Sequence, residues 1–177
     1  MQLLASIRVL SPIFEALQNS RKMKNKDILS KFYSSFSEGN AKGMVECYHK
    51  NVVFQDPAFG KLEGDKAKKM WEMLLSNKKT TIKVSYSNIQ TSNEKASADW
   101  IAEYVYGKRK VINKVSAKFK FKEGKIIAHI DHFNLWKWSI QALGPIGYLL
   151  GWTPFMKAKI QKKVNQKLAN YMAKTKT

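Results

Sequence analysis

The sequence is poor in several residue types on which common functional sites depend. Its single cysteine, Cys47, excludes a disulfide framework and a thiolate metal site. Only three histidines are present, and the chain has no glycine-rich phosphate loop, no Gly-x-Ser-x-Gly elbow and no His-Glu-x-x-His motif. These absences argue against nucleotide-binding, serine-hydrolase and zinc-protease sites, so we expect no metal and no other cofactor.

Acidic residues are also scarce. The chain has 13 Asp and Glu against 32 Lys and Arg, which gives a formal net charge of +19. A charge of this size usually indicates nucleic acid or an anionic membrane as partner. Arginine, however, occurs only as Arg8, Arg21 and Arg109, and readers of specific nucleic-acid sequences depend on arginine for bidentate contacts. The composition therefore argues against specific nucleic-acid recognition and favours a solvated surface of scattered lysines.

The 177 residues suit one domain with a proper core, flanked by two distinct ends. Residues 1–22 contain a short apolar run that is too short to span a bilayer, and they lack the usual secretory cleavage site. We interpret them as a flexible extension, or as a start-site artefact if translation begins at Met23. Residues 23–138 form the predicted domain, and residues 139–177 form an apolar linker followed by a cationic helix. The expected location is cytoplasmic, with a membrane-peripheral location as the alternative.

Hydrophobic periodicity predicts helices first and strands afterwards. We expect helices over residues 26–38, 41–48 and 65–76, with Asn40 and Asp65 as N-caps. A short strand over 52–56 and a turn over 60–64 separate the last two helices. Four longer strands are expected over residues 80–91, 96–106, 109–122 and 126–136. Helices on one side of a curved antiparallel sheet form an α+β cone, which leaves a pocket between the two layers.

The last predicted strand, residues 126–136, carries the best candidate for a site. Because side chains alternate across a strand, His129 and Asp131 share one face with Ile127, Phe133 and Leu135. The opposite face carries Ile126, Ala128, Ile130, His132, Asn134 and Trp136. An ionisable pair between apolar neighbours is costly unless it is partnered or lies in a cavity.

The C-terminal segment permits two interpretations. Thr153 and Pro154 predict the start of a helix that has one apolar face and many lysines. This helix can pack on the cone, where it would close the pocket or cover a dimer face. It can instead lie on an anionic membrane surface, with Leu149, Leu150 and Trp152 inserted. We favour packing, because a large apolar patch is rarely left exposed on a monomer.

Three stretches resemble the SnoaL-like and NTF2-like (nuclear transport factor 2) superfamily, which includes ketosteroid isomerase, limonene-epoxide hydrolase and the SnoaL-type polyketide cyclases. Phe54–Pro57 resembles its first-strand Asp-Pro element, Phe121–Ile126 its penultimate hairpin and His129–Trp136 its last strand. The resemblance covers about residues 26–138. It implies the cone fold and a small-molecule site, while the fold itself hosts many chemistries.

Individual residues carry over unevenly. Asp56 falls where ketosteroid isomerase keeps its general base, and Asp131 resembles the acid/base Asp of the cyclases in placement. The isomerase's oxyanion-hole Asp falls near Ala117 and its helix Tyr near Phe32, which argues against steroid isomerisation. The Asp-Arg-Asp trio of limonene-epoxide hydrolase has no counterpart, since Arg109 is the only arginine of the domain.

We therefore predict Asp56, His129 and Asp131 as catalytic residues that supply base, acid and orienting partner. The predicted activity is that of an isomerase, cyclase or hydrolase for an apolar carbonyl or epoxide compound. The alternative is a non-catalytic ligand-binding or interaction module of the same fold. The expected partners are a small apolar ligand and a second copy of the chain. The predicted substrate-binding residues are Tyr33, Tyr48, Trp100, Tyr104, Phe119 and Phe133.

Overall fold

The computed structural model describes residues 2–76 and 82–175. The N-terminal part comprises α1 (Gln2–Ser37), α2 (Ala41–Glu46), β1 (Tyr48–Asp56), β2 (Gly60–Glu63) and α3 (Asp65–Leu75). The long strands follow as β3 (Lys83–Thr91), β4 (Lys95–Tyr106), β5 (Arg109–Lys122) and β6 (Lys125–His132). Three helices end the chain, α4 (Leu135–Leu143), α5 (Pro145–Leu150) and α6 (Pro154–Lys174).

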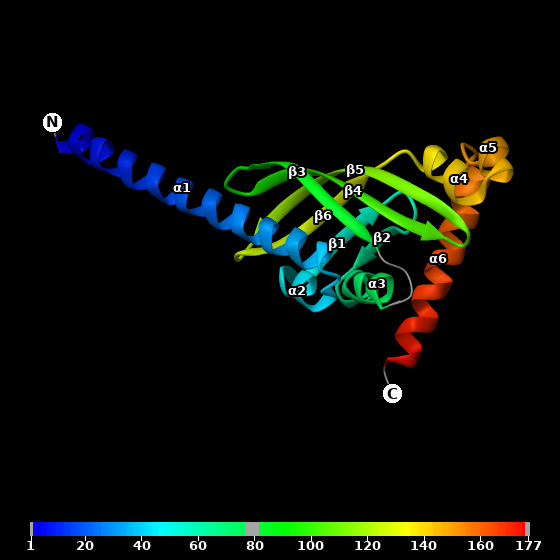
Figure 1. Ribbon diagram of the computed structural model, residues 1–177. Helices are drawn as coiled ribbons and strands as arrows, with labels where there is room; N and C mark the ends of the chain where they lie inside the picture. Colours follow the sequence, from blue (N-terminus) through cyan, green and yellow to red (C-terminus); the bar gives the residue numbers. More distant parts are fainter. Residues whose placement is uncertain (1, 77–81, 176–177) are drawn as a thin grey trace.

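The six strands form one curved sheet in the order β2-β1-β6-β5-β4-β3 (Figure 1). All neighbours pair antiparallel except β1 and β6, which pair in parallel and bring the early strand into the middle of the sheet. The predicted α+β cone is confirmed, and the sheet is mixed rather than purely antiparallel. Thr80 and Thr81 of the predicted strand over 80–91 lie outside the described residues.

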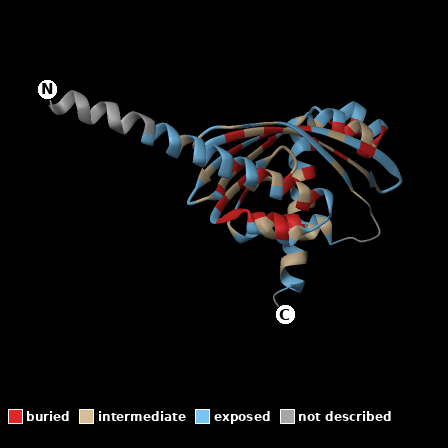
Figure 2. Cartoon of the chain, turned by 60° about the vertical axis from the view of Figure 1, so that its left-hand side comes forward, coloured by how far each residue is buried: buried red, intermediate tan, exposed pale blue. Residues whose placement is uncertain are grey.

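The core lies between the inner face of the sheet and the first three helices (Figure 2). Strand β5 shows the cause, because Val111, Val115, Ala117 and Phe119 are buried, Phe121 is half-buried and the lysines between them are exposed, which follows the predicted alternation. The hairpin into β6 follows from Glu123 and Gly124, which both adopt positive φ, as a two-residue turn between twisted strands requires. The helices contribute Leu29, Phe32, Tyr33, Phe36, Met44, Ala67, Met70 and Trp71 to this core.

Two expectations near the third helix are wrong. Residues 60–63 form strand β2, paired with β1 from Val53↔Glu63 to Asp56↔Gly60, where a turn was expected. The N-cap of α3 is Gly64, and Asp65 is the first helical residue. Strand β2 lies at the edge of the sheet and has only four residues, which are too few to show the alternation of apolar and polar residues that identifies a strand in the sequence.

The last strand ends earlier than predicted. Strand β6 stops at His132, because the Asn134 side chain accepts a hydrogen bond from the Lys137 N–H and so begins α4, which contains Trp136. A β-bulge also shifts the register between Lys120 and Phe121, which leaves Ile127 without a partner. Ile126 is therefore fully buried on the same side as His129, and the predicted place of Ile127 on that face is wrong.

Helix α1 extends far beyond the predicted start at residue 26. It begins at Gln2, and its N-terminal half projects away from the sheet (Figure 1). From Ile13 to Lys24 nearly every side chain is exposed, whereas Asn25 and Leu29 are buried. The boundary of the packed domain therefore lies close to the predicted position, and the flexibility of residues 1–22 remains a prediction.

The predicted C-terminal helix packs on the domain as α6. Thr153 caps it through a hydrogen bond from the Met156 N–H, as expected. The Gln161 side chain donates to the Pro57 carbonyl at 3.1 Å, and the Asn165 side chain donates to the Phe59 carbonyl at 2.8 Å. The segment before it is not an extended linker but the two short helices α4 and α5.

Candidate functional site

The strand register sets His129 and Asp131 in two adjacent rows on the inner face of the sheet. His129 pairs with Phe54 of β1 on one side and with Phe119 of β5 on the other. Asp131 stands opposite Ala117, whose small side chain leaves room beside the carboxyl group. Asp56 follows Gln55, the last β1 residue paired with β6, so its place in the sheet is beside Asp131.

The imidazole of His129 is fully buried and bonded at both nitrogens. Its Nδ1 lies 2.7 Å from the Tyr48 hydroxyl, and its Nε2 lies 2.9 Å from Asp131 Oδ1. The Trp71 indole donates to the same Tyr48 oxygen at 2.7 Å and can only donate. The Tyr48 hydroxyl thus links the Trp71 indole to one nitrogen of His129, and Asp131 lies against the other nitrogen.

Aromatic rings enclose this imidazole. The ring centroid of Phe119 lies 4.3 Å away, and those of Phe54, Phe32 and Trp71 lie at 5.2, 5.4 and 6.0 Å. This shell leaves no exposed surface on His129, and the hydrogen-bond partners of the imidazole are Asp131 and Tyr48. The same shell lowers the local polarity around the hydrogen bonds and strengthens them.

Asp131 is the inner carboxyl group of the cluster. It is 3% exposed, and its Oδ1 accepts hydrogen bonds from His129 and, at 3.3 Å, from the Trp100 indole. Two donors thus hold one carboxyl oxygen in place. The charge of Asp131 also raises the pKa of Tyr33 and of Tyr48, although burial is the larger cause for both hydroxyls.

Asp56 is the second carboxyl group, at the end of β1. The pKa of Asp56 is raised to about 7, chiefly by burial and to a smaller extent by the charge of Asp131. Backbone N–H groups of Phe59, Ala58 and Gly60 act in the opposite direction and hold the carboxyl over the turn. Asp56 in turn contributes to the raised pKa of Tyr104, after burial and Tyr106. Asp56, with its pKa raised to about 7, therefore interacts electrostatically with both Asp131 and Tyr104.

Tyr33 brings an unpaired hydroxyl to the same region. Its ring is fully buried and stacks on Tyr86 with 5.0 Å between the centroids. Among the described residues its hydroxyl oxygen has no hydrogen-bond partner. A buried hydroxyl without a partner is costly in a folded protein. The charge of Asp131 contributes to the raised pKa of Tyr33, so this hydroxyl lies within electrostatic reach of the carboxyl cluster.

Apart from Asp56 at the turn after β1 and the unpaired Tyr33, the predicted residues separate into two groups. Tyr48, Trp100, His129 and Asp131 form one hydrogen-bonded cluster, and Phe119 packs on it. Tyr104 and Phe133 lie between this core and a second one around Trp138, whose indole donates to the Tyr104 hydroxyl at 2.7 Å. Sequence reasoning missed Trp71, whose indole N–H donates to the Tyr48 hydroxyl. The usable signal was that a buried indole N–H needs an acceptor.

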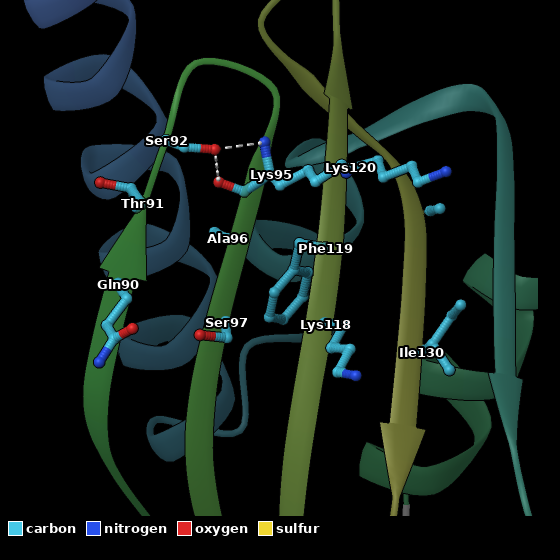
Figure 3. Close-up of a pocket in the computed structure, with 11 residues that line it drawn as sticks. Gln90, Thr91, Ser92, Lys95, Ala96, Ser97, Lys118, Phe119, Lys120 and Ile130 are labelled. Atoms are coloured by element: carbon cyan, nitrogen blue, oxygen red, sulfur yellow. Dashed lines mark hydrogen bonds between the residues drawn. The ribbon is translucent and has the colours of Figure 1, made fainter.

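The two larger surface hollows of the described chain are lined mainly, though not entirely, by side chains from the outer face of the sheet. One of about 520 Å³ is lined by residues of β3 to β6, including Gln90, Ser97, Lys118 and Ile130 (Figure 3). Phe119 contributes to this hollow. A second one is lined by Trp100 and Phe133 among others. Asp56, His129 and Asp131 line neither of them, so a ligand pocket at the carboxyl cluster remains a prediction.

Solved structures show the same fold in proteins of distant sequence. An epoxide hydrolase from M. tuberculosis, described as LEH-like, matches with a TM-score of 0.60 and 12% identity over 73% of this chain and 96% of its own. A candidate polyketide cyclase from Xanthomonas campestris pv. campestris matches at 0.57 and 13% identity, over 69% and 98%. SalBIII, an epoxide hydrolase/cyclase-like enzyme of pyran ring formation in salinomycin, matches at 0.55 and 17%, over 64% and 92%.

No curated protein matches the sequence. The model of the SnoaL-like domain, in contrast, matches residues 29–129, which is more than half of the chain. The matched range begins at the first fully buried residue of α1 and ends at His129 in the middle of β6. The resemblance seen in the sequence is thereby confirmed: the protein belongs to the SnoaL-like family.

Proposed function

We propose that the protein is an acid–base enzyme for a small apolar carbonyl or epoxide compound, with Asp56 as the group that exchanges the proton. The observation that carries this proposal is the pair of carboxyl groups that the parallel register of β1 and β6 brings together, Asp56 beside Asp131, where partial burial is the main cause that raises the pKa of Asp56 to about 7. A carboxyl group with this pKa exists in both protonation states at neutral pH. It can therefore accept a proton and return it within one cycle.

The second carboxyl group has a different role in this proposal. Asp131 is held by His129 and Trp100, and its charge raises the pKa of Asp56. His129 is a positioning residue, because it is enclosed by rings and contacts Asp131 rather than open space. Two carboxyl groups in different environments can divide the acid and base functions between them.

The chemistry needs no redox partner. As a carboxylate, Asp56 removes a proton from the carbon next to a carbonyl, and as an acid it returns that proton to another carbon of the same substrate. With an epoxide, the protonated Asp56 carboxyl gives its proton to the ring oxygen as the C–O bond breaks. A water molecule or a hydroxyl of the substrate forms the new bond to that carbon and gives its proton to the Asp131 carboxylate. The aromatic residues around the cluster favour an apolar substrate. The similar enzymes named above support this reaction class through fold alone.

The experiment compares carboxyl variants on a panel of apolar ketones and epoxides. On any substrate that is turned over, Asp56→Asn and Asp131→Asn should each lower kcat/KM by about 100-fold or more. The wild-type pH profile should contain a limb near pH 7 that Asp56→Asn removes. Asp99→Asn is the matched control, since Asp99 lies on the same sheet with its carboxyl bonded to Asn88 and Ser116 outside the cluster. Full turnover by both test variants would overturn the assignment.

A non-catalytic ligand-binding module is the second candidate. The unpaired Tyr33 hydroxyl favours it, because a ligand acceptor would satisfy that buried donor. Native mass spectrometry of the purified chain should then show a co-purifying small molecule whose occupancy falls in Tyr33→Phe. If a ligand is retained and no compound of the panel is converted, the binding function replaces the enzymatic one.

A further inference from the structure

Six large apolar side chains stand exposed at the junction of α5 and α6. We call this group the apolar tip: Ile146, Tyr148, Leu149, Leu150, Trp152 and Phe155. Between 43% and 68% of each residue's surface is exposed. The helices that carry the tip lie at the end of the molecule opposite the N-terminus of α1 (Figures 1 and 2). Exposed apolar clusters of this kind mark interaction sites rather than ordinary protein surface.

The fold presents the tip on a rigid support. A Cβ at Gly147 would lie 1.9 Å from the Ser139 carbonyl oxygen, so α5 crosses α4 at a distance that only glycine permits. Gly151 is similarly crowded by Ser139 and by Trp136. Gly144, with φ of 65°, makes the sharp turn between the two helices. The exposed side chains are therefore carried by closely packed helices and not by a loop.

The polar groups of the tip are satisfied within it. The Trp152 indole donates to the Leu149 carbonyl and the Trp136 indole to the Tyr148 carbonyl, both at 3.1 Å. The Thr153 hydroxyl and N–H both donate to the Leu150 carbonyl. The last carbonyls of α5 therefore have partners, although a short helix normally leaves them to water. The end of α5 can therefore enter a medium without water while these four carbonyls, of residues 147–150, keep their partners.

The charge around the tip has one sign. After Asp131 the sequence contains no Asp or Glu, whereas α6 carries Lys157, Lys159, Lys162, Lys163, Lys167 and Lys174. The Lys159 ammonium lies 5.9 Å from the centroid of the Phe155 ring, so positive charge directly borders the tip. A hollow of about 210 Å³ beside it has apolar walls that include Ile146 and Ile160, together with Lys159 and Lys163. Apolar walls and two lysines suit an acyl chain below an anionic headgroup.

We propose that the apolar tip docks the protein on an anionic membrane surface, with the tip inserted and the lysines of α6 at the headgroups. None of the described helices is long and apolar enough to cross a membrane, so the contact is interfacial. Charge argues against a second copy as the occupant, because two tips in contact would bring two lysine-rich helices together. The proposal is independent of the carboxyl cluster, whose variants leave the tip intact.

The experiment is sedimentation of the full chain with vesicles. Phosphatidylcholine vesicles containing about 30 mol% phosphatidylserine should bind at least about tenfold more tightly than pure phosphatidylcholine, and the difference should shrink in high salt. The double variant Leu149→Ser/Trp152→Ser should lower binding at least about tenfold. Phe14→Ser/Leu17→Ser is the matched control, since it removes two equally exposed apolar side chains from α1 and should leave binding unchanged.

A second measurement, tryptophan fluorescence with brominated lipid, uses a conservative single substitution in the tip. Brominated lipid should quench part of the tryptophan fluorescence of the wild-type chain, and Trp152→Phe should remove that part. The proposal would be overturned if the chain did not bind vesicles, or if it bound neutral vesicles equally well. It would also be overturned if the α1 control variant lost binding and the tip variant did not. A dimer in sedimentation velocity that only the tip variant dissociates would overturn it too, because a second copy would then be the occupant.

Discussion

The interior cluster and the apolar tip reverse the usual distribution of polar and apolar groups. Tyr48, His129 and Asp131 place polar atoms in the middle of a ring-lined core. The tip places residues such as Leu149 and Trp152 in contact with water. Both arrangements oppose the hydrophobic effect, and each is sustained by the fold around it.

The two regions differ in whether the monomer itself compensates the cost. In the core, both ring nitrogens of His129 have hydrogen-bond partners, so the cost of removing the imidazole from water is offset inside the molecule. At the tip, the backbone is satisfied but the apolar surface is not covered. The comparison teaches that the cost of burying polar groups in the core cluster is compensated within the monomer, whereas the cost of the exposed apolar tip is not.

The largest effect is expected from His129→Ala. The substitution removes a buried ring and leaves the Tyr48 hydroxyl and the Asp131 carboxyl without a partner. We expect the free energy of unfolding to fall by about 4 kcal/mol, from the cavity and the unpaired groups together. Urea denaturation measures this change. His132→Ala is the control, because the exposed neighbour should change stability by less than about 0.5 kcal/mol. Similar losses in both variants would show that the network contributes nothing.

The next effect is a dependence of stability on pH. The pKa of Asp56 is raised to about 7 in the folded protein, above the ordinary aspartate value of 3.8. The folded state therefore holds this proton where the unfolded chain has lost it, so the Asp56 contribution to stability declines as pH rises from about 4 to 7. The ceiling is on the order of 4 kcal/mol. Asp56→Asn should flatten this decline in urea denaturation at several pH values. An unchanged pH profile would mean that Asp56 titrates normally.

The smallest effect is expected at the tip. Leu149→Ser/Trp152→Ser should change the free energy of unfolding by less than about 0.5 kcal/mol, because these side chains bury little in the monomer. Trp138→Ala, in α4 and in the second core, should cost about 3 kcal/mol. Thermal unfolding of both variants in the absence of lipid makes the comparison. A large loss in the double variant would indicate that the tip is part of the monomer's own core.

Much of the fold was predictable because the strands of this chain are long and regular. The strands over 96–106 and 109–122 are found almost as predicted, since their alternation is continuous and glycine marks the turns between them. Shorter signals failed. Strand β2 has four residues, and the bulge at Ile127 depends on its partner strand, which no local pattern encodes.

The candidate site was predictable as a set of residues but not as a network. The sequence placed His129 and Asp131 on one face, and the structure bonds them at 2.9 Å. The links to Tyr48 and Trp71 come from β1 and α3, far away along the chain, so only the packed helices and the parallel pairing of β1 with β6 create them. The roles of Asp56, His129 and Asp131 in catalysis remain predictions.

By itself, the sequence determined the order of helices and strands, the family and the sign of the surface charge, because these depend on local periodicity and composition. Only the tertiary structure decided that the imidazole of residue 129 is sealed among rings while the apolar residues after Gly144 stay outside. The physical reason is that burial is a property of what packs against a side chain. A tryptophan in α3 and one beside α6 have the same hydrophobicity, and their neighbours alone separate them.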